Sequence, residues 1–185
     1  QEEYKIDDAI KIGQRFFGEN RVQEAIQRWE NRIKDYNDIE LRLIGPLQTN
    51  KVKQALKIFN VIETIDREKL AKSISDNIDD NIKTKSFYIQ VNTGDEVQKA
   101  GVLALEANNF IEFCKNDLSL PIIGLMCIPP ENEEPAMHFS LLRKLAIKNN
   151  LIELSMGMSN DFEEAIKFGA TSVRIGSKFF GDRKY

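Results

Sequence analysis

The sequence predicts an α/β fold, a (β/α)8 barrel of the TIM type that lacks its first strand. Seven stretches with helical periodicity alternate with seven short apolar stretches, always in the order helix then strand. No linker rich in Pro or Gly and no low-complexity segment divides the 185 residues, so we expect one domain over residues 1–185. A doubly wound sheet also alternates in this way, but seven repeated units favour a barrel.

Each predicted helix is marked by apolar residues that recur three and four positions apart. In the second helix, Val22, Ala25 and Trp29 belong to one apolar stripe. Asn160, three residues before Glu163, is expected to cap the last helix. The predicted helices lie within 6–13, 22–33, 52–59, 70–78, 105–114, 138–146 and 162–166.

Each predicted helix is followed by a short strand. The predicted strands are 15–17, 41–45, 61–65, 87–91, 121–127, 152–156 and 172–175. The stretch 121–127 is almost entirely apolar, which is typical of a strand buried on both faces.

The series begins with a helix and ends with a strand, which is what an eight-stranded barrel becomes when its first strand is absent. Such a barrel has an open seam with two unpaired strand edges. We therefore expect the natural protein to continue upstream of Gln1 and to supply the first strand there.

Composition excludes several classes of function. With 26 basic against 29 acidic residues, the formal net charge is −3, which argues against a nucleic-acid partner. Cys114 and Cys127 form no CxxC pair, and His138 is the only histidine, so neither a disulfide framework nor a histidine-based metal site is expected. No apolar run approaches the roughly 18–20 residues of a membrane span. A cytoplasmic protein with no membrane partner is predicted.

The loops after the last two strands carry the strongest chemical signal. Barrel enzymes commonly bind phosphate between these two loops. In the first of them Gly157 permits close backbone approach and Ser159 offers a hydroxyl, while in the second Gly176 and Ser177 can complete a phosphate nest beside the cation of Arg174. Taken one at a time, Ser159 or Asn160 could be a helix cap, Gly176 a turn residue and Arg174 a solvated charge. Taken together, the two loops favour a phosphate site.

Six motifs in this chain, in order, resemble the pyridoxal phosphate homeostasis protein family. The motifs are residues 18–24, 44–51, 90–94, 124–130, 154–159 and 173–176. The resemblance implies a single-domain barrel of the alanine racemase N-terminal type that binds pyridoxal 5'-phosphate (PLP). It also implies a non-catalytic carrier, more often a monomer than an obligate oligomer, that acts in vitamin B6 and amino-acid homeostasis, with PLP-dependent apoenzymes as possible partners.

The resemblance also assigns the residues that bind the cofactor. Those against the phosphate would be Met158, Ser159, Gly176 and Ser177. Arg174 would face the pyridine nitrogen, and Asn20 would lie beside the ring. An arginine at that nitrogen disfavours the pyridinium form, which weakens the cofactor as an electron sink and suits a carrier.

One functional residue of the family has no counterpart here. The lysine that forms the Schiff base lies in a Ser-Lys motif at the end of the family's first strand, so it is expected upstream of Gln1. Lys5 and Lys11 lie in the first helical stretch and do not match it. Two smaller departures are Arg42 and Pro46, where relatives often carry histidine.

Two other functions stay open at this stage. A PLP-dependent amino-acid racemase-like enzyme would need a second general base across the ring, and no tyrosine lies in a motif that places one there. A barrel that binds another phosphorylated metabolite would use the same two loops without the lysine.

Overall fold

The chain folds into a parallel sheet that curves into a nearly closed barrel, in a computed structural model that describes residues 2–181. Neighbouring strands follow the order β1-β2-β3-β4-β6-β7-β8, and every pair is parallel. The strands are β1 (Phe16–Glu19), β2 (Glu40–Leu43), β3 (Val61–Ile65), β4 (Ser86–Asn92), β5 (Val102–Leu103), β6 (Ile122–Met126), β7 (Glu153–Met158) and β8 (Ser172–Arg174). This order confirms the predicted barrel and excludes a doubly wound sheet, whose strand order reverses at a switch point.

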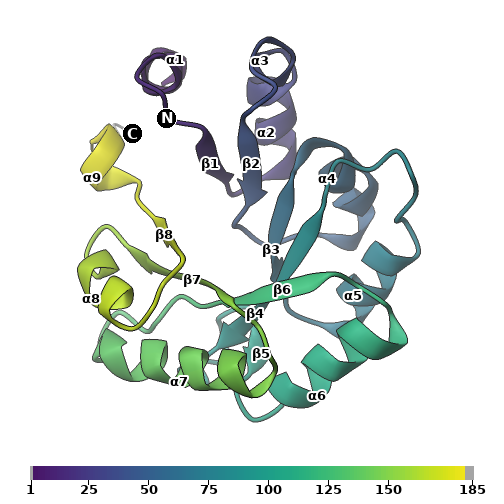
Figure 1. Ribbon diagram of the computed structural model, residues 1–185, viewed down its shortest axis with the longest axis vertical. Helices are drawn as coiled ribbons and strands as arrows, with labels where there is room; N and C mark the ends of the chain where they lie inside the picture. Colours follow the sequence, from purple (N-terminus) through teal and green to yellow (C-terminus); the bar gives the residue numbers. More distant parts are fainter. Residues whose placement is uncertain (1, 182–185) are drawn as a thin grey trace.

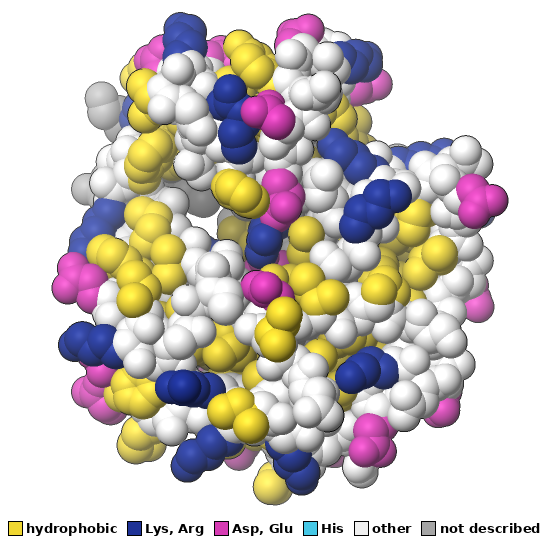
Figure 2. Space-filling model, viewed as in Figure 1, with side chains coloured by type: hydrophobic (Ala, Val, Ile, Leu, Met, Phe, Trp, Pro, Cys, Tyr) yellow, Lys and Arg dark blue, Asp and Glu magenta, His cyan; other side chains and the backbone are white. Residues whose placement is uncertain are grey.

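The helices surround the strands (Figure 1). They are α1 (Glu3–Lys11), α2 (Val22–Trp29), α3 (Arg32–Asp35), α4 (Val52–Ile58), α5 (Glu68–Ser75), α6 (Ala107–Glu112), α7 (Pro135–Lys148), α8 (Phe162–Lys167) and α9 (Ser177–Phe180), with a 3-10 turn (Thr49–Lys51) and a π-helical turn (Phe113–Asp117). Among residues 2–181, no helix is both long and apolar enough to cross a membrane. Acidic and basic side chains are interspersed over the face drawn in Figure 2.

The core has two parts because side chains of a barrel strand alternate between its outer and inner faces. The large outer part fills the space between sheet and helices, and Trp29, Phe59 and Phe139 are fully buried in it. A small second cluster forms around Val61, Tyr88 and Met126. The inner face also carries polar residues, and these build the site described below.

The barrel is open between its first and last described strands. Within residues 2–181, β1 pairs only with β2, and β8 pairs only with β7. The two unpaired edges were predicted from the sequence; that a further strand fills the gap stays a prediction. Phe16 at this opening is 60% exposed, although it begins a strand.

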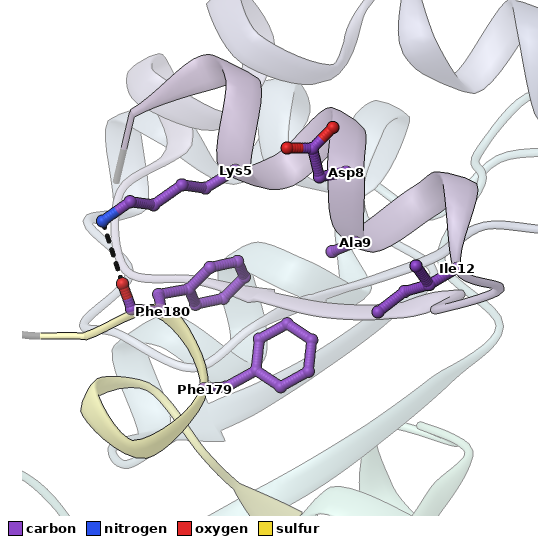
Figure 3. A pocket seen from close by; sticks show the side chains of 6 residues that line it. All are labelled: Lys5, Asp8, Ala9, Ile12, Phe179 and Phe180. Carbon is purple, nitrogen blue, oxygen red and sulfur yellow. Dashed lines mark hydrogen bonds between the residues drawn. The ribbon is translucent and has the colours of Figure 1, made fainter.

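Helices α1 and α9 approach each other beside the opening, and the ammonium of Lys5 donates to the carbonyl oxygen of Phe180 at 2.9 Å. A cavity of about 380 Å3 lies between the two helices, with Ala9, Ile12 and Phe179 in its lining (Figure 3).

Several boundaries differ from those predicted. The strand predicted at 15–17 extends through Gly18 and Glu19, so the turn begins at Asn20. The predicted helix 22–33 is broken into α2 and α3, and β5 and α9 were not predicted because elements of two and four residues are too short to show periodicity. Ile123 is 36% exposed, so the strand within 121–127 is not buried on both faces throughout.

The predicted cap of α8 is wrong. Asp161, and not Asn160, precedes the helix, and no side chain caps its first turn. The Asp161 carboxylate instead accepts a hydrogen bond from the backbone N–H of Met158 at 2.6 Å. The loop therefore folds back on the end of β7.

Ion pairs with two arginines, Arg28 in α2 and Arg32 in α3, hold helix α1 to the rest of the barrel. Glu3 pairs with Arg28 at 3.2 Å and with Arg32 at 2.6 Å. Asp7 pairs with Arg32 at 2.7 Å. The hydrogen bond from Arg32 holds the pKa of Asp7 below its ordinary value, so this ion pair stabilises the folded chain at neutral pH.

We expect Asp7→Asn to lower the free energy of unfolding by about 0.2–1 kcal/mol at pH 7, the range of partly exposed ion pairs. Because the pKa of Asp7 is lowered on folding, its contribution is complete above about pH 4 and disappears as the pH falls through the folded pKa. Urea unfolding of both chains between pH 3 and pH 7 measures this. Asp8→Asn, which removes only the exposed pair with Lys11, is the control. A difference between wild type and Asp7→Asn that is independent of pH would contradict the assignment.

Candidate functional site

The candidate site lies at the carboxyl ends of β7 and β8, where two loops meet. In the register of these strands Met158 is the partner of Arg174. The backbone N–H of Lys178 in α9 points to the hydroxyl of Ser159 at 3.4 Å, which links the two loops. Ser159 is buried and Met158 is 38% exposed. The structure thus brings together three of the residues that the sequence analysis assigned to the site.

Gly176 and Ser177 form the open side of this site. Both are exposed. A Cβ added at Gly176 would meet no atom within 4 Å, so there is free space directly over its backbone. At Gly157 the backbone is in the left-handed region (φ +92°), and an added Cβ would lie 2.6 Å from the Cβ of Ala165, which explains why this loop needs glycine.

Arg174 extends from β8 along the inner face of the barrel and is half-buried. Its Nη1 donates to the Oγ of Ser155 and its Nη2 donates to the carbonyl oxygen of Cys127, both at 2.7 Å. Burial lowers the pKa of Arg174, and the charge of Glu63 acts in the opposite direction. Within residues 2–181, no carboxylate oxygen lies within 4.0 Å of this guanidinium. The site therefore presents a cation whose charge is not directly paired.

A buried polar network lies behind Arg174. Ser155 donates its hydroxyl to Oε2 of Glu63 at 2.5 Å, and Oε1 of Glu63 accepts from Nη1 of Arg42 at 3.0 Å. Arg42 also pairs with Glu40 at 2.6 Å and lies 5.9 Å from the centre of the Tyr88 ring. Ser155 and Glu63 were not predicted as site residues. The signal was present, since Glu63 is the one charged residue within the strand 61–65.

Asn20 lies on the other side of the opening. It follows β1, one edge strand, whereas Arg174 ends β8, the other. Asn20 is exposed, and its backbone packs on the loop after β2 so closely that a Cβ at Gly45 would lie 2.3 Å from the Asn20 carbonyl oxygen. The structure thus places Asn20 at the rim of the barrel and shows no contact between it and Arg174.

The remaining rim is formed by the loops after β4 and β6. A Cβ at Gly94 would lie 2.3 Å from Pro130. Lys99 pairs with Glu96 at 2.6 Å and donates to the Pro129 carbonyl oxygen at 3.1 Å. Its ammonium is therefore engaged in holding these loops together. Residues 2–181 contain no group of three or more His, Cys, Asp or Glu side chains arranged to hold a metal ion.

One carboxylate lies close to the candidate phosphate position. Asp161 accepts from the Met158 N–H, so this backbone donor is occupied by an anion of the protein itself. The negative charge of Asp161 also acts on the guanidinium of Arg174 and opposes the lowering of its pKa. An anionic ligand at this rim would compete with Asp161 for the same donor.

Comparison with known proteins now identifies relatives of this chain. The alanine racemase N-terminal domain family matches residues 6–184. A pyridoxal phosphate homeostasis protein of Aquifex aeolicus is 43% identical over 97% of this chain and 82% of its own length. The protein of the same name from Escherichia coli K12 is 34% identical, over 97% of this chain and 81% of its own length.

Comparison with solved structures supports the same family assignment. PipY of Synechococcus elongatus, solved with PLP bound, superposes with a TM-score of 0.86 and 31% identity, over 97% of this chain and 87% of PipY. Alanine racemase of Corynebacterium glutamicum shares the fold, with a TM-score of 0.74 at 18% identity, over 99% of this chain and 52% of the racemase. The barrel, the ordered motifs and the extent of these matches show that this chain belongs to the alanine racemase N-terminal domain family and, within it, to the pyridoxal phosphate homeostasis proteins.

Proposed function

We propose that this chain binds PLP at the carboxyl ends of β7 and β8 and serves as a carrier in vitamin B6 homeostasis. The observation that supports this most directly is Arg174, a half-buried cation without a carboxylate within 4.0 Å in the described part of the chain. A pyridine nitrogen accepts a hydrogen bond from such a donor. The names of the relatives and PLP-bound PipY support the same ligand.

The residues of the rim fit the two ends of this ligand. The phosphate would lie against Ser159, Ser177 and the free space over Gly176, where the exposed Ser177 and the backbone around Gly176 offer hydroxyl and N–H donors. Arg174 would donate to the pyridine nitrogen, with Asn20 at the ring's edge. Bound PLP supplies an aldehyde and a conjugated ring that can accept electrons. The protein's part is to orient the ring and to keep its nitrogen unprotonated, since arginine can only donate a hydrogen bond to that nitrogen and cannot accept one from a protonated ring.

The carrier role is favoured over a racemase-like one by the properties of the tyrosines. Tyr88 is fully buried, and burial raises its pKa to about 12, so it is a poor base near neutral pH. Tyr4 and Tyr36 are exposed, on α1 and after α3; Tyr185 lies outside the described residues. We also propose a cytoplasmic monomer that passes PLP to apoenzymes, as the family resemblance implies.

The central test is the affinity for PLP of wild type, Arg174→Ala and Arg174→Lys, measured by equilibrium dialysis. Loss of a hydrogen bond from a charged donor costs about 1.5–3 kcal/mol, so we expect Arg174→Ala to bind roughly 10- to 100-fold more weakly. Lysine keeps the charge without the planar fork, and we expect an intermediate loss. Arg143→Ala, which changes an exposed arginine of α7, is the control. Equal affinity of wild type and Arg174→Ala would refute the proposed site.

Gly176→Ala tests the phosphate position separately. The new methyl group meets no protein atom, and the φ of −112° is accessible to alanine, so the thermal unfolding midpoint should hardly change. If the phosphate lies over Gly176, the methyl group takes part of its space, and affinity should fall about tenfold for PLP and for inorganic phosphate as competitor. Unchanged affinity for both ligands would move the phosphate elsewhere on the rim.

Asp161→Asn tests how the negative charge of Asp161 affects a bound phosphate. Asparagine can still accept this hydrogen bond but carries no charge, so the repulsion of a bound phosphate is removed. We expect PLP to bind several-fold more tightly, with the gain shrinking as salt is raised from 0.01 to 0.5 M. Glu164→Gln on the neighbouring turn of α8, whose carboxylate pairs with Lys167, is the matched control. Weaker PLP binding by Asp161→Asn would show that the carboxylate assists the ligand.

A further inference from the structure

The guanidinium of Arg174 is held from behind by a chain of hydrogen bonds that crosses the barrel. The chain runs from Arg174 on β8 to Ser155 on β7 and on to Glu63 on β3. Ser155 and Glu63 are each 0% exposed, and the side-chain hydrogen bonds of these two residues are made to each other, to Arg174 and to Arg42. A buried charge or hydroxyl that loses its partner costs free energy. This cost keeps the side chains of Ser155 and Glu63 in the hydrogen-bonded arrangement.

The direction of each hydrogen bond in this chain is fixed by the chemistry of its ends. Arginine can only donate, so Ser155 must accept from Arg174 with a lone pair of its oxygen. A carboxylate can only accept, so the single hydroxyl proton of Ser155 must point to Glu63. Ser155 therefore has one orientation, and its lone pair faces Arg174.

Glu63 also balances the charges inside the barrel. Its second oxygen accepts from Arg42, and Arg42 is paired in turn with Glu40. Arg174 has no direct carboxylate partner among residues 2–181, and Glu63 acts on it through one hydroxyl. A direct contact with a carboxylate would occupy the N–H groups that a ligand needs, whereas the serine uses one N–H of the fork and leaves the charge available.

We propose that Ser155 and Glu63 are positioning residues for Arg174: they fix the plane of its guanidinium so that a free N–H faces the ligand's ring nitrogen. This inference rests on the proposed function for the identity of the ligand. Neither residue touches the ligand in this scheme. Cys127 contributes through its backbone carbonyl, which holds the second nitrogen of the fork, so substitution of its thiol should have little effect on the guanidinium.

The first measurement needs no ligand. Nitrogen-15 spectra of the arginine side chains report how fast each guanidinium rotates, and Arg174→Lys identifies the signal of Arg174. We expect slowly rotating Nη groups in wild type and faster rotation in Ser155→Ala and Glu63→Gln. Thr84→Val is the control, because Thr84 is a buried hydroxyl that bonds to the Leu56 and Phe59 carbonyl oxygens away from the site. It should lower stability without changing the Arg174 signal.

The second measurement uses PLP labelled with nitrogen-15 at the ring. In wild type we expect the ring nitrogen to show the shift of the unprotonated form from pH 6 to pH 8. In Ser155→Ala the mobile guanidinium of Arg174 should hold the ring nitrogen less firmly. The nitrogen-15 signal of the ring should then move toward that of the protonated form as the pH falls, and the affinity for PLP should fall about fivefold. A merely structural role would lower stability, as in Thr84→Val, without changing this pH profile.

The outcomes separate the two proposals. If Arg174 rotates equally fast in wild type, Ser155→Ala and Glu63→Gln, the positioning role is overturned, whatever PLP does. If its rotation depends on Ser155 but wild type does not bind PLP, positioning is supported and the proposed function fails. If PLP binds and its pH profile is identical in wild type and Ser155→Ala, the ring nitrogen does not depend on the hydrogen-bonded chain, and the positioning role for the ligand is overturned.

Discussion

A fully buried carboxylate, that of Glu63, sets the arrangement of the barrel interior. Leaving such a charge without partners would cost several kcal/mol, and its two oxygens are satisfied by groups from β2 and β7. Strand β2 is the neighbour of β3, whereas β7 is separated from β3 by β4 and β6, so Ser155 can reach Glu63 only because the sheet curves round. The curvature of the sheet and the pairing of this charge therefore depend on each other.

The same network gives the site its electrostatic character. A cation in contact with its own carboxylate is neutralised and has few N–H groups left to offer. By placing a serine between Arg174 and Glu63, the fold keeps the guanidinium oriented while its charge remains available at the rim. Burial lowers the pKa of Arg174, yet an arginine stays protonated at neutral pH. The result is a fixed donor that does not change state with pH.

Strands β1 and β8 are the two unpaired edges of the described barrel, and the sequence predicts a further strand between them. In a closed barrel each strand has two neighbours and no edge is exposed. Here two edges face each other across the gap, and α1 and α9 come together beside it through the hydrogen bond from Lys5 to Phe180 (Figure 3). The proposed ligand contacts are distributed over both sides, with Asn20 on the β1 side and Arg174 on the β8 side.

Much of this could be predicted from the sequence, because apolar periodicity and loop motifs are local properties. The seven main strands, the alternation with helices, the unpaired edges and the grouping of Ser159 with Arg174 all follow from short stretches of residues. Local patterns could not show that Asp161, and not Asn160, precedes α8, because the choice depends on how the loop folds back on Met158. Nor could they show that Glu63 and Ser155, which are 92 positions apart in the chain, share a hydrogen bond. Only the curvature of the sheet, which brings β3 and β7 to the same interior, decides which buried charges and hydroxyls meet.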